Sequence, residues 1–218
     1  MMKKRKGKVG PSSRPSVVPK QMNGTLNGAR PNTPKRIIVG ICGASGIGYA
    51  LDLLKALRQA DVETHVIWSD WASRVLEEEE NISMAEAGRL ASVTHDYHDM
   101  GASISSSSFL VDGMVVIPAT VKTTSEIACA HTGNLIVRCA DNMLKTQRPL
   151  VLAIRETPLS PPCLENLYKI SLFGGIVLPL SPGFYHRPKN IGDLRAFISG
   201  KIMDGLGIRH NRFKRWRG

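Results

Sequence analysis

The sequence is poor in cysteine, and its cysteines lack the spacing of a metal site. There is no Cys-x-x-Cys pair, and no histidine stands at a zinc-ligand distance from a cysteine. His95 and His98 would share a metal on a helix, but polar residues on both sides indicate a loop and two surface histidines. We expect no metal site. Because cytosolic thiols usually remain reduced, we assign to the core or to a pocket wall the four cysteines Cys42, Cys129, Cys139 and Cys163.

Acidic residues are missing from the first 36 positions, which hold ten Lys or Arg residues of a chain whose net charge is +11. The rest of the chain is therefore nearly neutral. The same segment has five prolines and many small polar residues, a composition that cannot bury enough apolar surface to offset its ordering entropy. We expect residues 1–35 to form a disordered basic extension and residues 36–218 to form one domain.

Long apolar runs are also missing, and no apolar signal-peptide core follows the first lysines. We therefore expect a cytoplasmic protein with no membrane partner. The basic extension leaves two alternatives, a mitochondrial transit peptide and a nucleic-acid-binding tail. Its prolines and its excess of Lys over Arg disfavour the first. We also expect no nucleic-acid partner, and deletion of residues 1–35 would abolish any such affinity.

Short apolar runs rich in β-branched residues alternate with segments of helical periodicity. Buried parallel strands have such continuous apolar runs, and their alternation with helices favours a doubly wound α/β fold, a parallel sheet in a three-layer sandwich. The expected strands are Arg36–Ile41, Glu63–Trp68, Met114–Ile117, Leu150–Ile154 and Gly175–Leu178. The expected helices cover Tyr49–Leu57, a segment from about Ser69 to Glu80, one long stretch after Thr123 through Leu144, and Ile191–Leu206.

The residues that follow these strands are small, polar or cationic. In open α/β sheets, ligands bind beyond the carboxyl ends of the strands, where a glycine turn and a helix N-terminus can bind phosphate. The first turn lacks the G-x-G-x-x-G spacing, and Ser69 stands where a ribose-binding acid would follow the second strand. A mononucleotide is therefore favoured over NAD. These strand-end residues are Gly43–Gly46, Ser69, Thr120–Thr123, Arg155–Glu156 and Phe184–Tyr185.

Two motifs are the most specific in the chain, Arg-Glu-Thr-Pro-Leu at 155–159 and Phe-Tyr-His-Arg-Pro at 184–188. In this order and spacing, with the turn at 43–46, they resemble the flavin prenyltransferase family, over about residues 36–216. The resemblance implies a flavodoxin-like, Rossmann-like fold and transfer of a dimethylallyl group from dimethylallyl phosphate to reduced FMN without a metal. It also implies a homododecamer whose subunit contacts complete the site, and a prenylated-FMN-dependent decarboxylase that receives the product.

The same resemblance implies roles for individual residues. The catalytic residues would be Glu79, Glu156 and Ser45, and either glutamate would relay the proton that the flavin ring loses. Cations at the donor site would stabilise the departing phosphate. The donor-site residues would be Tyr185, Lys201, Arg138, Lys145 and Trp216. The FMN-binding residues would be Gly43, Ala44, Ser45, Ser69, Thr120, Val121, Lys122, Thr123 and Arg155.

Each assignment has a structural alternative. Glu79 lies in a run of four glutamates that would ordinarily form a solvated helix face, and Arg138 and Lys145 would otherwise serve salt bridges. Lys201 stands where the family often has Arg, which would offer a bidentate fork, and Ser107 stands where Gly is usual. The functional alternative is an FMN-binding protein of the cysteine-decarboxylase-like class, whose substrate-clamping motif we do not find, or a non-catalytic decarboxylase subunit.

Overall fold

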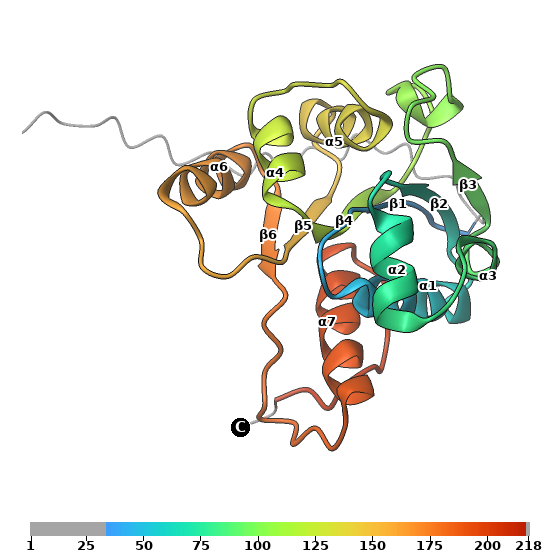
Figure 1. Ribbon diagram of the computed structural model, residues 1–218, viewed down its shortest axis with the longest axis vertical. Helices are drawn as coiled ribbons and strands as arrows, with labels where there is room; N and C mark the ends of the chain where they lie inside the picture. The colour runs from blue at the N-terminus through green and yellow to red at the C-terminus, as the bar shows by residue number, and fades with distance from the viewer. Residues whose placement is uncertain (1–33, 217–218) are drawn as a thin grey trace, which may run out of the picture.

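The computed structural model describes residues 34–216, so the predicted basic extension, apart from Pro34 and Lys35, lies outside the described residues. Within them, parallel strands form one six-stranded sheet in the order β3-β2-β1-β4-β5-β6 (Figure 1). The predicted doubly wound α/β fold is confirmed. The strands are β1 (Arg36–Ile41), β2 (Glu63–Trp68), β3 (Val93–His95), β4 (Gly113–Ala119), β5 (Leu150–Ile154) and β6 (Ile176–Pro179).

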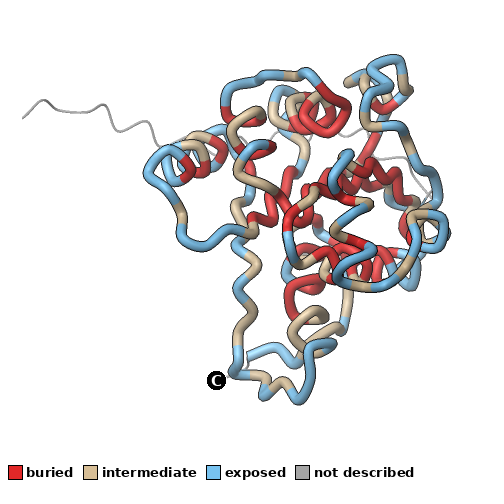
Figure 2. Tube along the Cα trace, viewed as in Figure 1, coloured by how far each residue is buried: buried red, intermediate tan, exposed pale blue. Residues whose placement is uncertain are grey.

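Helices cover both faces of the sheet, and a separate hydrophobic cluster lies on each face. Figure 2 shows the buried residues gathered along the sheet and the helices beside it. The helices α1, α2, α3 and α7 contribute to one cluster, and α4, α5 and α6 contribute to the other. The helices are α1 (Ile47–Gln59), α2 (Ala72–Glu80), α3 (Met84–Gly88), the 3-10 turn η1 (Ser103–Ser105), α4 (Val121–Ala128), α5 (Leu135–Lys145), α6 (Pro161–Leu172) and α7 (Ile191–Gly205).

Continuous apolar strands explain this three-layer arrangement. Along β1, Ile37, Val39 and Ile41 pack on the α1 and α7 side, whereas Ile38 packs on the α4 and α5 side. Successive side chains of a strand point to opposite faces, so a strand that is apolar at every position must be covered twice. All four of these residues are almost fully buried.

The structure differs from the sequence-based expectation at several places, among them the helices α3 and α6, neither of which was predicted. The edge strand β3 was not predicted, because Val93–His95 is short, partly exposed and flanked by polar residues. The long helical stretch is two helices, since Ala130 adopts a left-handed conformation (φ 53°) and the Asn134 side chain then caps α5 by accepting from the Val137 amide. β4 continues through Pro118 to Ala119 with a register shift against β5.

Strand order fixes where a ligand can reach the sheet. β1 pairs with β2 on one side and with β4 on the other. The chain adds β2 and β3 on one side of β1 and then crosses back to add β4, β5 and β6 on the other. Ligands of open α/β sheets bind at such a switch point, beyond the carboxyl ends of the strands. The loops that follow β1, β2, β4 and β5 all open at this edge.

Candidate active site

The turn between β1 and α1 packs tightly against the segment that follows β2. A Cβ atom added to Gly43 would lie 2.4 Å from the Trp71 Cβ and 2.8 Å from its carbonyl carbon, so only glycine permits this approach. The Ser69 amide donates to the Ile41 carbonyl at 2.9 Å. These contacts bring the exposed Ser45 and the half-buried Ser69 to the same corner of the sheet.

The N-terminus of α1 is capped from another helix. Gly46 stands at the N-cap with φ 92° and has no side chain to cap with. The Glu79 carboxylate, at the end of α2, instead accepts from the Gly46 amide at 2.8 and 3.1 Å and from the Ile47 amide at 3.0 Å. Negative charge at a helix N-terminus is favourable. Glu79 therefore has a defined partner, which the solvated-face alternative did not anticipate.

Glu79→Ala is expected to lower the free energy of unfolding by about 1 to 2 kcal/mol, because two backbone amides lose a charged acceptor. Glu77→Ala is the matched control, since Glu77 is exposed on the same helix. It lies near the C-terminus of that helix, where the helix dipole does not stabilise a negative charge. Urea unfolding of the two variants measures the difference. Equal stability of both variants would contradict the capping role.

The turn between β4 and α4 is ordered by hydroxyl groups. Thr120 caps α4 by accepting from the Thr123 amide at 3.1 Å, and its hydroxyl also donates to the Thr123 hydroxyl at 3.1 Å. The Thr123 hydroxyl lies 3.3 Å from the Cys42 sulfur, which connects this turn to the end of β1. Burial raises the pKa of the Cys42 thiol, so this group stays protonated and serves packing. Lys122 extends to solvent and pairs with Glu126 at 3.5 Å.

Arg155 lies at the same edge of the sheet, directly after the end of β5. Its amide donates to the Ala119 carbonyl at 3.2 Å, which places it beside the β4 turn. Its side-chain Nε is buried and has no hydrogen-bond partner within residues 34–216. A buried cationic donor without an acceptor is costly, so this atom fits a site for an anionic or polar ligand group. The next residue, Glu156, is exposed and accepts from the Thr157 amide at 2.9 Å.

The predicted FMN-binding residues therefore come together at the carboxyl edge. The contacts between Gly43 and Trp71, Cys42 and Thr123, and Arg155 and Ala119 connect the loops in one continuous group. The group offers exposed hydroxyls, the backbone amides of a glycine turn and the Arg155 Nε, which has no hydrogen-bond partner among the described residues. These donors fit a flavin mononucleotide, whose phosphate and ring carbonyls are acceptors.

The predicted donor-site residues are divided between the two faces of the sheet. Arg138 and Lys145 lie on α5, whereas Lys201 lies on α7, and Figure 1 shows these helices on opposite faces. Arg138 donates to the Ser105 carbonyl at 3.1 Å, and Lys145 pairs with Asp141 at 3.6 Å. Lys145 therefore forms the ion pair that the structural alternative supposed, whereas the partner of Arg138 is a backbone carbonyl.

The other donor-site residues gather beside α7. The segment between β6 and α7 extends away from the sheet, as does the C-terminal segment (Figure 1). The Tyr185 ring packs edge-on against Phe197 at 5.8 Å and against Trp216 at 5.9 Å. Phe197 and Lys201 are four residues apart and so are neighbours on one helix face. One chain thus brings Tyr185 to Trp216 and places Lys201 one helical turn from Phe197, but does not bring Arg138 or Lys145 to them.

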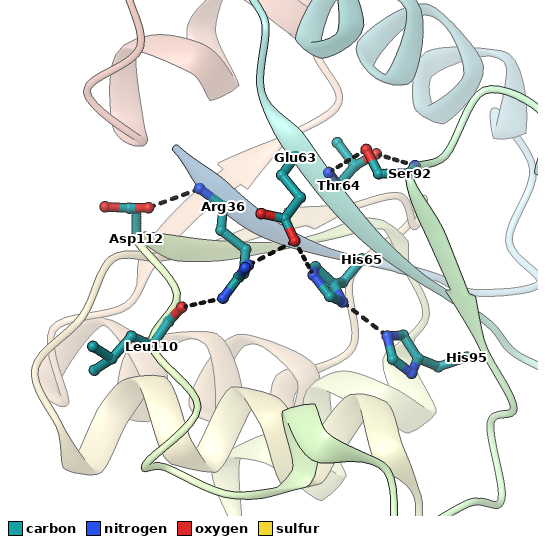
Figure 3. Close-up of polar contacts among 8 residues, drawn as sticks. All are labelled: Arg36, Glu63, Thr64, His65, Ser92, His95, Leu110 and Asp112. Carbon is teal, nitrogen blue, oxygen red and sulfur yellow. Dashed lines mark hydrogen bonds and ion pairs between the residues drawn. The ribbon is translucent and has the colours of Figure 1, made fainter. Parts of the chain in front are cut away.

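The predictions for His95 and for Cys129 are wrong. His95 is partly buried, and its Nε2 lies 2.9 Å from Nδ1 of His65, whose Nε2 lies 3.0 Å from a Glu63 carboxylate oxygen (Figure 3). The position was predicted to be a surface histidine because β3 itself was not predicted. His98 is exposed, as expected, and pairs with Asp70. Cys129 is exposed rather than in the core or a pocket wall, while the other three cysteines are buried.

The histidine cluster stands apart from the candidate site. Arg36 and Glu63 begin β1 and β2, so the cluster lies toward the amino edge of the sheet (Figure 3). Burial opposes ionisation of Glu63, but hydrogen bonds from Arg36 and His65 outweigh it and lower the Glu63 pKa. Burial and the neighbouring His65 lower the pKa of His95. The cluster joins three strands and is structural.

No group of three or more His, Cys, Asp or Glu side chains in residues 34–216 has the arrangement of a metal site. No helix among these residues is both long enough and apolar enough to span a bilayer.

Comparison with known proteins gives consistent matches over most of the chain. The Flavoprotein family model matches residues 26–173. Flavin prenyltransferase LpdB of Lactiplantibacillus plantarum is 48% identical over 185 residues, 84% of this chain and 99% of LpdB. A crystal structure of AnUbiX in complex with FMN and dimethylallyl pyrophosphate has a TM-score of 0.84 and 38% identity, covering 85% of this chain and 99% of that one.

A second similar solved structure is that of an oligomeric protein. The dodecameric FMN-dependent UbiX-like decarboxylase from Escherichia coli O157:H7 has a TM-score of 0.81 and 39% identity. The match covers 84% of this chain and 100% of that chain.

Proposed function

This chain belongs to the flavin prenyltransferases of the flavoprotein family, and from that membership we infer that it transfers a dimethylallyl group from a phosphorylated donor to reduced FMN. The observation that supports FMN binding at the carboxyl edge is the group of hydrogen-bond donors there. It consists of hydroxyls, backbone amides and the Arg155 Nε, which has no partner within residues 34–216. Bound reduced FMN supplies the nucleophilic atoms N5 and C6. The chain must then bind the donor, neutralise the leaving phosphate and accept a proton.

We propose that FMN is held by the residues of three loops. Ser45 and Ser69 offer hydroxyl donors at the β1–α1 corner, and the turn at 43–45 offers backbone amides. Thr120–Thr123 are fixed by the α4 cap, and Arg155 offers its buried Nε. Because Glu79 already takes the amides of Gly46 and Ile47, the FMN phosphate is expected on the Ser45 side of the turn.

We propose that Ser45 and Glu79 act as a pair in proton transfer, with the departed donor phosphate carrying the proton to them from the flavin ring, since the FMN phosphate beside Ser45 lies a ribityl chain away from that ring. Glu79 is bound to the amides directly after Ser45, so its carboxylate is held at the turn that carries this hydroxyl. A fixed carboxylate beside a hydroxyl can accept a proton and pass it on. Glu156 is the alternative relay, because it is exposed at the end of β5 directly after Arg155.

The donor site requires more than one copy of the chain in this proposal. Tyr185, Lys201 and Trp216 would bind the donor phosphate and cover it, while Arg138 and Lys145 lie on the opposite face of the sheet. A homododecamer, the assembly of the Escherichia coli relative, would allow neighbouring copies to supply the missing cations. The product would be passed to a prenylated-FMN-dependent decarboxylase.

Prenyl transfer is expected only from an oligomer, because a single copy leaves the strand-end crevice open to water and the donor cations apart. Light scattering of the active fraction measures its mass, and dilution measures whether specific activity falls as the oligomer dissociates. A monomer with full specific activity would contradict this proposal.

The activity itself is tested by anaerobic incubation with reduced FMN and dimethylallyl phosphate, followed by mass analysis of the released flavin. A flavin heavier by one isoprene unit is expected, and a parallel sample with dimethylallyl pyrophosphate identifies which donor is used. FMN that binds but returns unchanged with both donors would reject prenyl transfer. That outcome would favour the cysteine-decarboxylase-like or non-catalytic alternative.

A further inference from the structure

The C-terminal segment 208–216 folds back along α7, and we refer to it as the strap. The close packing depends on Gly200, in the middle of α7. A Cβ atom at this position would lie 2.6 Å from the Phe213 ring and 2.7 Å from the His210 ring. Phe213 also packs against Phe197 at 4.9 Å. The glycine therefore leaves the space in which two rings of the strap contact the helix.

Two aspartates hold the strap by ion pairs. Asp204, near the end of α7, accepts from Arg215 at 2.7 and 3.1 Å and from the His210 Nε2 at 3.0 Å. Asp52, on α1, accepts from Arg212 and from the Ser199 hydroxyl. The Arg215 hydrogen bond lowers the pKa of Asp204, so this carboxylate stays charged. One exposed ion pair contributes little, but a bidentate pair that shares its carboxylate with a histidine is better fixed.

The strap packs on α7 on one side and faces a cavity on the other. Residues 212–214 of the strap line a cavity of about 370 Å³, whose other lining residues are His186, Arg187, Lys189 and Asp193. Trp216, at the end of the strap, is 73% exposed, and its ring contact is Tyr185 at 5.9 Å. With so little packing around it, the position of Trp216 is set by the contacts of the strap on α7 and α1.

We propose that Asp204, Asp52 and Gly200 are positioning residues for the donor site, because they hold the strap so that Trp216 meets Tyr185. The inference rests on the proposed function, in which Tyr185 and Trp216 bind and cover the phosphorylated donor. None of the three touches the reacting atoms. Their effect is on donor affinity, through the ordering of Trp216 before the donor binds.

The test uses the full-length protein with Asp204→Asn, which keeps the shape of the side chain and every tryptic site of the strap while removing the charge. Faster tryptic loss of the C-terminal residues, by about tenfold, is expected together with an increase of about tenfold in the donor KM. FMN affinity is expected to be unchanged. Asp204→Glu should restore part of both properties, and Gly200→Ala should reproduce the increased KM by a steric route.

The matched control is Glu165→Gln, which removes another exposed ion pair, with Lys169 at 2.8 Å, outside the strap. It should change neither tryptic release nor donor KM. Three results with Asp204→Asn would overturn the inference while leaving the proposed function intact. They are faster tryptic release of the strap at an unchanged donor KM, an unchanged rate of tryptic release, and a parallel loss of FMN affinity. A parent protein that transfers no prenyl group would reject the proposed function, and the inference with it.

Discussion

Replacing Ser45 with glutamate is expected to abolish FMN binding. Ser45 is exposed in the turn before α1, and the proposal places the FMN phosphate beside its hydroxyl. The new carboxylate would place its negative charge beside the phosphate, and like charges repel. At a separation of about 4 Å and an effective dielectric near 20, each such repulsion costs about 4 kcal/mol. The steric bulk of the longer side chain adds to this cost.

The loss of FMN affinity should be at least about a hundredfold, which corresponds to about 2.8 kcal/mol. Titration of flavin fluorescence or equilibrium dialysis measures it. Ser171→Glu is the matched control, because Ser171 is an exposed serine near the end of α6. Its FMN affinity should equal that of the parent. Unchanged affinity in Ser45→Glu would mean that the phosphate does not bind at this turn.

Lys201→Ala is expected to leave the protein loaded with FMN but to reduce prenyl transfer about a hundredfold or more. Lys201 is exposed on α7, beyond Phe197, and forms no ion pair with residues 34–216. Its removal should therefore cost little stability. A departing phosphate gains negative charge in the transition state, so loss of a cation at the donor site weakens donor binding and slows the departure.

Lys201→Arg should recover much of the activity, because the charge is kept and a bidentate fork is added. Steady-state rates across donor concentrations, with the FMN content of each variant measured beforehand, separate donor binding from the rate of transfer. Lys55→Ala, an exposed lysine on α1, is the control and should transfer at the parent rate. If Lys201→Ala also transfers at that rate, Lys201 is a surface lysine and the donor-site assignment is wrong.

The sheet and the FMN side of the candidate site could be predicted from sequence because their signals are local. Buried strands such as Leu150–Ile154 are apolar at every position, and the residues directly after them are polar. Parallel strands place these following residues at one edge, so the grouping of Ser45, Thr120 and Arg155 follows from topology. β3 escaped prediction because a short edge strand needs no apolar run.

The sequence by itself therefore determined the fold class, the family and the edge of the sheet where the flavin is expected. Only the tertiary structure decided which charges find partners. It put Glu79 on the N-terminus of α1, left the Arg155 Nε buried without an acceptor in the described part of the chain, and joined Asp204 to Arg215. Hydrophobic periodicity is set along the chain, whereas hydrogen bonds between side chains depend on distances across it that no local pattern encodes. For the same reason, only the structure separated Arg138 and Lys145 from the residues on α7.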